Sequence, residues 1–209
     1  MSKNLKTILS LKHKTVEIHR DGPTVIIGER INPTGRKAVL AALQKGDFEI
    51  VRQDAIAQVD AGATVLDVNA GVPGADEVAL LSQVIQEVMS VVDVPLCIDT
   101  ASPQALEEAL KLYEGKALIN SVNGEEKSLE TVLPLAKEFG VAVIGLCMDD
   151  DGIPATPELR LKVAARVIER AARFGIPLED IIIDPLAMTM GADHTSGLTT
   201  LRTIEQIGR

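Results

Sequence analysis

One pattern repeats along the chain and limits what it can fold into. A short apolar run ends in a polar cluster, and an amphipathic helix follows it. The runs recur at about the length of a βαβ unit. They are Thr24–Gly28, Thr64–Val68, Val94–Ile98, Ala117–Ile119, Val141–Leu146 and Asp180–Ile183. Strands that alternate with helices predict an α/β fold with a parallel sheet and right-handed crossovers.

The helices that separate these strands carry clear start and stop signals. Asp76, Ser102 and Thr156 are predicted N-caps, and prolines follow two of them at the first helical position. Gly140 and Gly175 follow the last helical residues, where a left-handed conformation ends many helices. The predicted helices are Asp76–Ser90, Ser102–Tyr113, Ser128–Phe139 and Thr156–Phe174.

Polar residues at the strand ends favour a barrel over a doubly wound sheet. Five of the six strands end in acid or amide residues, and only a barrel brings all strand ends to one mouth. The expected fold is therefore a (β/α)₈ TIM barrel. Six units precede Arg209, so strands seven and eight are expected to be missing from this chain. The predicted domains are an N-terminal extension at 1–24 and a C-terminally incomplete barrel at 25–209.

The N-terminal extension is predicted to form a β-hairpin. Lys14–Ile18 and Pro23–Ile27 are its expected strands, and Asp21-Gly22 is a common turn sequence. Such a hairpin is expected to cover the closed end of the barrel, which is a structural role.

Composition narrows the classes of partner and the compartment. The formal net charge is −9, there is no Trp and one Tyr, and no basic block is present, so nucleic acid is not an expected partner. Cys97 and Cys147 lie in apolar runs without a Cys-x-x-Cys motif, which favours a reduced cytoplasmic location. No apolar stretch approaches the roughly 20 residues of a membrane span.

The strand-end residues are the candidate functional residues. The carboxylates are those of Asp67, Asp99 and Asp184, and the amides are those of Asn69, Asn120 and Asn123. One such Asp often only caps the next helix, but capping alone does not account for six positions in register. The histidines show no ligand spacing, so no metal site is predicted, and glycine-rich phosphate loops are absent.

Five ordered motifs resemble the pterin-binding methyltransferases. They are IGERINPTGRK (Ile27–Lys37), LDVNAG (Leu66–Gly71), CIDT (Cys97–Thr100), LINSVN (Leu118–Asn123) and IIIDPL (Ile181–Leu186). This family includes corrinoid-linked methyltransferases and the folate domain of cobalamin-dependent methionine synthase. The resemblance covers nearly the whole chain after about Pro23 and implies a barrel of the pterin-binding type.

The resemblance assigns roles to particular residues. Asp99, Asn120 and Asp184 match residues that hold the pterin, and they are the predicted catalytic residues. Asp67 and Asn69 lie in a motif near the pterin, and Asn32 follows strand one; both sets are added to the predicted pterin-binding residues. A cluster of carboxylates and amides suits the 2-amino-4-oxo edge of a pterin, because that edge both donates and accepts hydrogen bonds. An Asn on strand seven that helps to activate N5 in the family has no counterpart here.

The predicted function is methyl transfer between N5 of (methyl)tetrahydrofolate and the cobalt of a corrinoid (cobalamin) carried by a partner protein. Homodimerisation is expected from the family. A dihydropteroate synthase-like enzyme is an alternative, although its usual Asn-x-Thr-x-Asp-Ser-Phe loop is replaced here by Asn32–Lys37. The sequence also leaves open a non-catalytic, truncated folate-binding module and a purely structural barrel.

Overall fold

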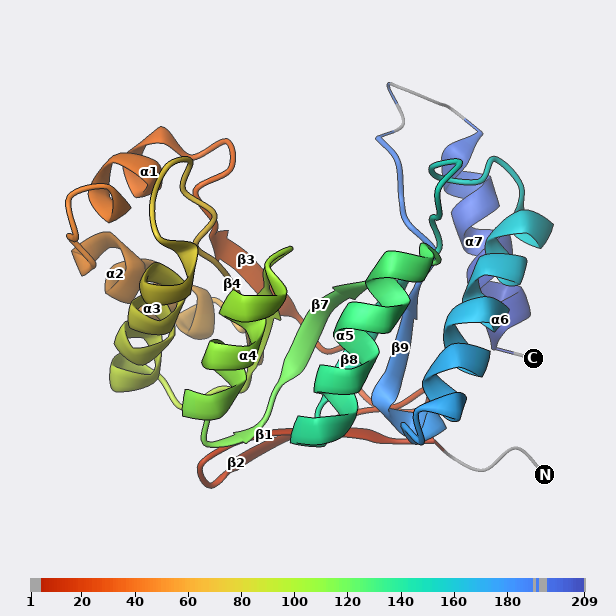
Figure 1. Ribbon diagram of the computed structural model, residues 1–209, viewed down its shortest axis with the longest axis horizontal. Helices are drawn as coiled ribbons and strands as arrows, with labels where there is room; N and C mark the ends of the chain where they lie inside the picture. The colour runs from red at the N-terminus through yellow and green to blue at the C-terminus, as the bar shows by residue number, and fades with distance from the viewer. Residues whose placement is uncertain (1–4, 190, 192–194, 209) are drawn as a thin grey trace. The chain divides into compact units, whose positions relative to one another are not determined.

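The computed structural model describes residues 5–189, 191 and 195–208, and its elements follow the predicted alternation (Figure 1). The strands are β1 (Thr7–Leu11), β2 (Lys14–Ile18), β3 (Ile27–Ile31), β4 (Val65–Asn69), β5 (Leu96–Asp99), β6 (Gly115–Lys116), β7 (Leu118–Val122), β8 (Ala142–Leu146) and β9 (Ile181–Asp184). The helices are α1 (Lys37–Leu43), α2 (Glu49–Asp60), α3 (Glu77–Val91), α4 (Pro103–Leu112), α5 (Glu126–Phe139), α6 (Pro157–Arg173), the 3₁₀ turn η1 (Leu178–Asp180) and α7 (Ser196–Ile207).

A six-stranded sheet contains every strand that the repeat predicts. Its order is β3-β4-β5-β7-β8-β9, with β3 and β9 at the two ends. The pairs β3–β4, β4–β5, β5–β7 and β8–β9 are parallel, as connections through helices require. The α/β class and the parallel sheet are therefore confirmed.

The chain divides into two compact units. The first comprises residues 1–120 and 139–142, and the second comprises 121–138 and 143–209. In the first unit, α2, α3 and α4 lie side by side, with α2 against β3 and α3 against β4 (Figure 1). Their contacts form an aliphatic core around Leu66, Leu81, Ile85, Leu96 and Leu106, all of them almost fully buried. In the second unit, α6 packs against both β9 and α7.

Helix caps explain where three of these helices begin. Asp76 accepts hydrogen bonds from the amides of Val78 and Ala79, and Ser102 accepts one from Ala105. Thr156 caps α6 in the same manner, with a longer bond of 3.4 Å to the amide of Leu159. The caps that the sequence predicted are confirmed at all three positions.

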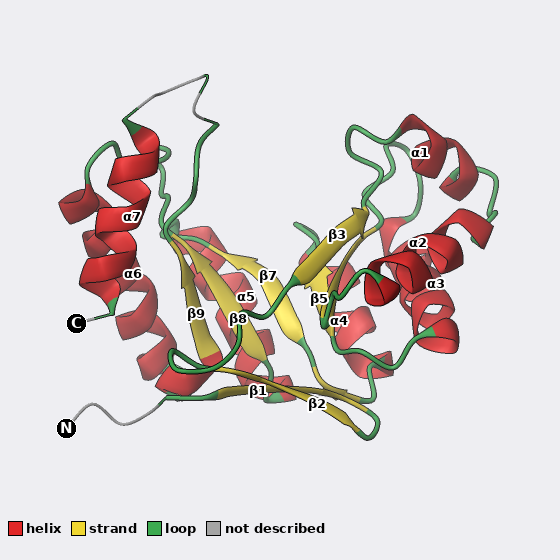
Figure 2. Ribbon diagram, turned by 180° about the vertical axis from the view of Figure 1, so that it is seen from behind, coloured by secondary structure: helices red, strands yellow, loops and turns green. Residues whose placement is uncertain are grey.

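The hairpin prediction was wrong in its strands. Lys14–Ile18 pairs with the preceding segment, Thr7–Leu11, and not with Pro23–Ile27 (Figure 2). The turn lies at Lys12-His13, where Lys12 adopts a positive φ of 51°. A turn does form near Gly22, whose amide donates to the carbonyl of His19, but in the part of the chain that the structure describes no strands pair across it. Strand β6 pairs with β1 and completes a separate three-stranded sheet.

In the described part of the chain, no helix is both long enough and apolar enough to cross a membrane.

Candidate functional site

In the first unit, the carboxyl ends of β4 and β5 and the part of β7 up to Asn120 carry a row of polar side chains. The parallel register aligns Asn69 with Asp99, and Asp99 with Asn120. Two positions earlier it aligns Asp67 with Cys97. Because side chains alternate along a strand, residues two positions apart lie on the same face. Strand pairing therefore gathers Asp67, Asn69, Cys97, Asp99 and Asn120 on one face of the sheet.

Two amides hold the two carboxylates of this cluster in place. Asn120 Nδ2 donates to Asp67 Oδ2 at 3.0 Å, and Asn69 Nδ2 donates to Asp99 Oδ2 at 3.0 Å. Asn69 is itself anchored, since its Oδ1 accepts from the amide of Gly71 at 2.8 Å. Each carboxylate thus has one oxygen oriented by an amide on another strand: adjacent β4 supplies the amide for Asp99, and β7, on the far side of β5, supplies the one for Asp67.

The second oxygen of Asp67 is the unusual atom of the cluster. Asp67 is only 2% exposed, and within the described residues no group meets hydrogen-bond distance and angle at its buried Oδ1, although the thiol of Cys97, a weak donor, lies beside the carboxylate. A buried acceptor without a donor is destabilising by roughly 1–3 kcal/mol. A ligand that brings an N–H group to this oxygen would remove that penalty. The geometry therefore suits a ligand with hydrogen-bond donors.

Burial and mutual repulsion set the electrostatics of the cluster. Burial raises the pKa of Asp67 to about 6, and the charge of Asp99 adds to the effect, while the hydrogen bond from Asn120 opposes it. Burial also raises the pKa of Asp99, helped by the charges of Glu29 and Glu77 and opposed by the bond from Asn69. A donor to either carboxylate stabilises its ionised form.

Cys97 belongs to this cluster, although the sequence analysis did not include it among the candidate functional residues. Its fully buried thiol lies beside Asp67, and burial followed by the charge of Asp67 raises the pKa of the thiol well above its usual range. The thiol is therefore a neutral neighbour of the carboxylate and not a nucleophile. The period of two along β5 was the available signal, since it places Cys97 on the face that carries Asp99.

The remaining predicted residues follow other strands or the end of β7. Asn32 follows β3, where its side chain is engaged by the loop: Nδ2 donates to Glu29 and Oδ1 accepts from the amide of Thr34. Asp184 ends β9 in the second unit, and its Oδ1 accepts from the amide of Leu186 at 2.7 Å. Asn123 similarly accepts from the amide of Glu125. At each of these positions, one side-chain oxygen thus accepts a hydrogen bond from the backbone two residues further on and stabilises a local turn.

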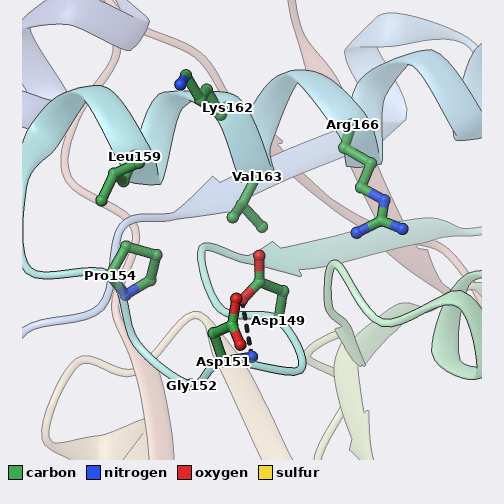
Figure 3. Close-up of a pocket in the computed structure, with 8 residues that line it drawn as sticks. All are labelled: Asp149, Asp151, Gly152, Pro154, Leu159, Lys162, Val163 and Arg166. Carbon is green, nitrogen blue, oxygen red and sulfur yellow. Dashed lines mark hydrogen bonds between the residues drawn. The ribbon is translucent and has the colours of Figure 1, made fainter.

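The second unit also contains a pocket of about 290 Å³ beside α6 (Figure 3). Leu159 and Val163 on α6 form an apolar wall with Pro154, and Asp149 and Asp151 lie across from Val163. Asp149 Oδ1 accepts from the amide of Asp151, so this acidic turn is locally closed. Lys162 and Arg166 complete the lining, which makes the pocket mixed in charge.

Comparison with known proteins shows the family of the chain. Residues 28–209 match the model of the pterin-binding enzyme family. The chain belongs to this family.

Two curated relatives within the family are similar in sequence to this chain. The chain is 32% identical to the methylcorrinoid:tetrahydrofolate methyltransferase of Eubacterium limosum, over 88% of this chain and 68% of that protein. It is 26% identical to the methionine synthase of Mycobacterium tuberculosis, over 95% of this chain but only 18% of that much longer protein.

Solved structures with the same fold include dihydropteroate synthases. That of Vibrio fischeri superposes with a TM-score of 0.62 at 22% identity, covering 97% of this chain and 75% of that one. That of Thermus thermophilus gives a TM-score of 0.60 at 25% identity, over 96% and 72%. At such identities the likeness supports the fold, whereas activity depends on the site itself.

Proposed function

We propose that this protein binds the pterin ring of a tetrahydrofolate and moves a methyl group between its N5 and the cobalt of a corrinoid on a partner protein. The observation that carries the proposal is the buried carboxylate of Asp67, with one oxygen fixed by Asn120 and the other without a donor in the described residues. The relative in Eubacterium limosum, whose name states this pair of substrates, supports the choice of reaction.

The chemistry of the pterin edge matches the polar cluster. That edge presents a 2-amino group and a ring N–H, which are donors, beside a 4-oxo acceptor. Asp67 and Asp99 are proposed to accept from the donors, and Asn120 to align the first carboxylate. Asn69 fixes the orientation of the Asp99 carboxylate through its hydrogen bond to Oδ2. Asp184 is proposed as a further contact to the ring, and Asn32 as a residue of the surrounding loop.

Methyl transfer from N5 breaks the N5–methyl bond, and N5 takes up a proton. The corrinoid of the partner supplies the cobalt that receives or returns the methyl group. This chain's own residues bind and orient the ring, so that the methyl carbon points at its acceptor. Such orientation supplies much of the acceleration when two large reactants must meet.

We further infer that the six βα units are those of a (β/α)₈ barrel and that 25–209 form one barrel domain. The agreement with the synthase folds supports this inference. A cytoplasmic location is proposed because the two cysteines of the described chain are buried and unpaired. A corrinoid protein is the proposed partner, and a homodimer is the proposed assembly.

Calorimetric titration with 5-methyltetrahydrofolate tests the proposed site. We expect the wild-type protein to bind, and Asp99→Ala to weaken binding by roughly 1.5–3 kcal/mol, the usual loss for a hydrogen bond to a charged group. Asp93→Ala is the matched control, because Asp93 is an exposed carboxylate that makes only a 3.5 Å contact with Lys14. Equal affinities in all three proteins would exclude the site. Methylation of free cob(I)alamin by the binding-competent protein then tests the reaction.

A further inference from the structure

Arg160, on α6 in the second unit, is a buried cation whose acceptors are neutral oxygens. The residue is 2% exposed. Its Nε donates to the carbonyl of Pro154 at 2.9 Å, and its Nη1 donates to the carbonyls of Pro185 and Leu186, each at 2.7 Å. Within the described residues, no carboxylate lies within ion-pair distance of it. Burying a guanidinium is costly, so this arrangement needs every one of these hydrogen bonds.

The bonds converge on the segment that follows β9. The carbonyl of Leu186 receives a second donor, Thr200 Oγ1, at 3.0 Å, and Arg160 also reaches that hydroxyl at 3.2 Å. Ser196 Oγ accepts from the amide of Met188, two residues further on. The inward face of α7 is therefore polar because it holds this segment, whereas an ordinary packed helix face would be apolar.

Leu186 needs this support because its backbone is strained. Its φ is +63°, in the left-handed region that residues other than glycine, asparagine and aspartate rarely adopt. Such conformations persist where surrounding contacts fix them, and they are commonest at functional sites. The amide of Leu186 lies in the same peptide plane as the Pro185 carbonyl that Arg160 holds, and it donates to Asp184 Oδ1 at 2.7 Å.

We propose that Arg160 is a positioning residue that fixes the orientation of the Asp184 carboxylate. It acts through the carbonyls of Pro185 and Leu186, which hold the Leu186 amide against Asp184 Oδ1. The backbone of Asp184 is fixed separately, because its carbonyl accepts from the amide of Cys147 at 2.9 Å in the sheet. Only the side chain depends on the Arg160 contact. Its consequence for the ligand rests on the proposed function, in which Asp184 contacts the pterin.

Hydrogen exchange of the Leu186 amide measures the positioning without any ligand. In Arg160→Met we expect this amide to lose about tenfold or more of its protection, comparable to one lost charge-assisted hydrogen bond. The amides of β9 should keep their protection, which separates a local effect from general unfolding. Arg160→Lys should give an intermediate value. Arg166→Met is the control, because Arg166 is exposed on the same helix.

Thr200→Val covers the case in which Arg160→Met does not fold. Valine has the shape of threonine but lacks the hydroxyl that donates to Leu186, so a smaller loss of Leu186 protection is expected. A folded Arg160→Met with unchanged Leu186 exchange would overturn the proposal. If that variant does not fold, unchanged exchange in Thr200→Val would overturn it equally.

Titration with 5-methyltetrahydrofolate gives the second readout. We expect Arg160→Met to bind about tenfold more weakly than the wild type, but to cause no further loss in an Asp184→Ala background. Additive losses would show that Arg160 acts on binding by another route and would refute the link through Asp184. If the wild-type protein binds no folate, the proposed function fails, and the exchange measurement alone decides the role of Arg160.

Discussion

At the scale of single residues, the buried carboxylate of Asp67 lowers the stability of the folded protein when it is ionised. Its carboxyl has an ordinary pKa of 3.8, which burial raises to about 6 in the folded protein. Between these values the folded protein holds a proton that the unfolded chain has lost. Stability therefore falls as pH rises through this window, and the penalty is fully present above about pH 6. Because the ionised Asp67 carboxylate destabilises the fold, we expect this residue to have a role in ligand binding.

Asp67→Asn removes this penalty with little change of shape. We expect its unfolding free energy to vary less than that of the wild type between about pH 4 and pH 6, by about 2 kcal/mol. The variant should accordingly be the more stable protein above pH 7. Urea denaturation across this pH range is the measurement. An unchanged pH dependence would show that Asp67 titrates normally in the folded state.

The sequence predicted which residues would meet at the strand ends better than it predicted how they meet. Asp67, Asn69, Asp99 and Asn120 do share one face, as parallel strands require. The cross-strand bonds from Asn120 to Asp67 and from Asn69 to Asp99 depend on register, which no local pattern in these strands specifies. That these residues bind a pterin stays a prediction, and so does the role of Asp184.

At the scale of elements, local signals succeeded where they were strong and failed where they were missing. The capped helices α3, α4 and α6 were predicted within a few residues. Helices α1 and α2 were not predicted, and neither has a side-chain N-cap bond. The hairpin was misplaced because its true turn uses Lys12 at positive φ, while the Asp21-Gly22 sequence gave the stronger turn signal.

Gly28 illustrates how one element fits another, and it supports a prediction at this scale. A Cβ at this position of β3 would lie 2.7 Å from Gln58 Oε1 of α2 and 3.1 Å from Ala63 Cβ. Gln58 is not free to move, because its Oε1 accepts from the amide of Arg30 at 2.8 Å. Gly28→Ala should therefore lower the free energy of unfolding by about 1–3 kcal/mol, the usual cost of overpacking.

Thermal and urea unfolding of Gly28→Ala measure this cost, and a double-mutant cycle identifies its cause. In a Gln58→Ala background the clash with Oε1 is gone, so the added methyl group should cost clearly less. A cost that is the same in both backgrounds would assign the effect to Ala63 or to the strand itself.

At the scale of the whole molecule, the net charge of −9 sets a balance between repulsion and ion pairing. Most of the ion pairs are exposed, as with Lys6–Glu17 and Lys111–Glu107, and exposed pairs contribute little each. Repulsion among the excess carboxylates should therefore be the larger effect of the two. Salt weakens this repulsion once the screening length falls to about 10 Å, near 0.1 M.

We therefore expect the melting temperature at pH 7.5 to rise by a few degrees when potassium chloride is raised from about 10 mM to about 0.2 M. Near the sequence pI of about 4.9 the rise should disappear, because the net charge is then small. Scanning calorimetry in both buffers makes the comparison. A fall with salt at pH 7.5 would mean that the ion pairs outweigh the repulsion.

Whether the protein is a methyltransferase or a dihydropteroate synthase is also a question about the whole molecule, because both enzymes share this fold. The solved synthases match the fold, but the methyltransferase of Eubacterium limosum matches the sequence more closely, at 32% identity. After β3 this chain has the loop Asn32–Lys37, which lacks the Asp-Ser-Phe of the usual synthase pattern. The loop is held in its own arrangement, since Asn32 binds the amide of Thr34 and Arg36 pairs with Asp54.

We accordingly expect no pteroate when the protein is supplied with p-aminobenzoate and a dihydropterin diphosphate, under conditions in which 5-methyltetrahydrofolate binds. A bona fide synthase assayed in parallel is the control for the reagents. Pteroate formation above the enzyme-free background would overturn the methyltransferase assignment while leaving the pterin cluster in place, because both reactions need the same edge of the ring to be held. Absence of pteroate together with folate binding would remove the synthase alternative, and methylation of cob(I)alamin would then separate a methyltransferase from a folate-binding module without activity.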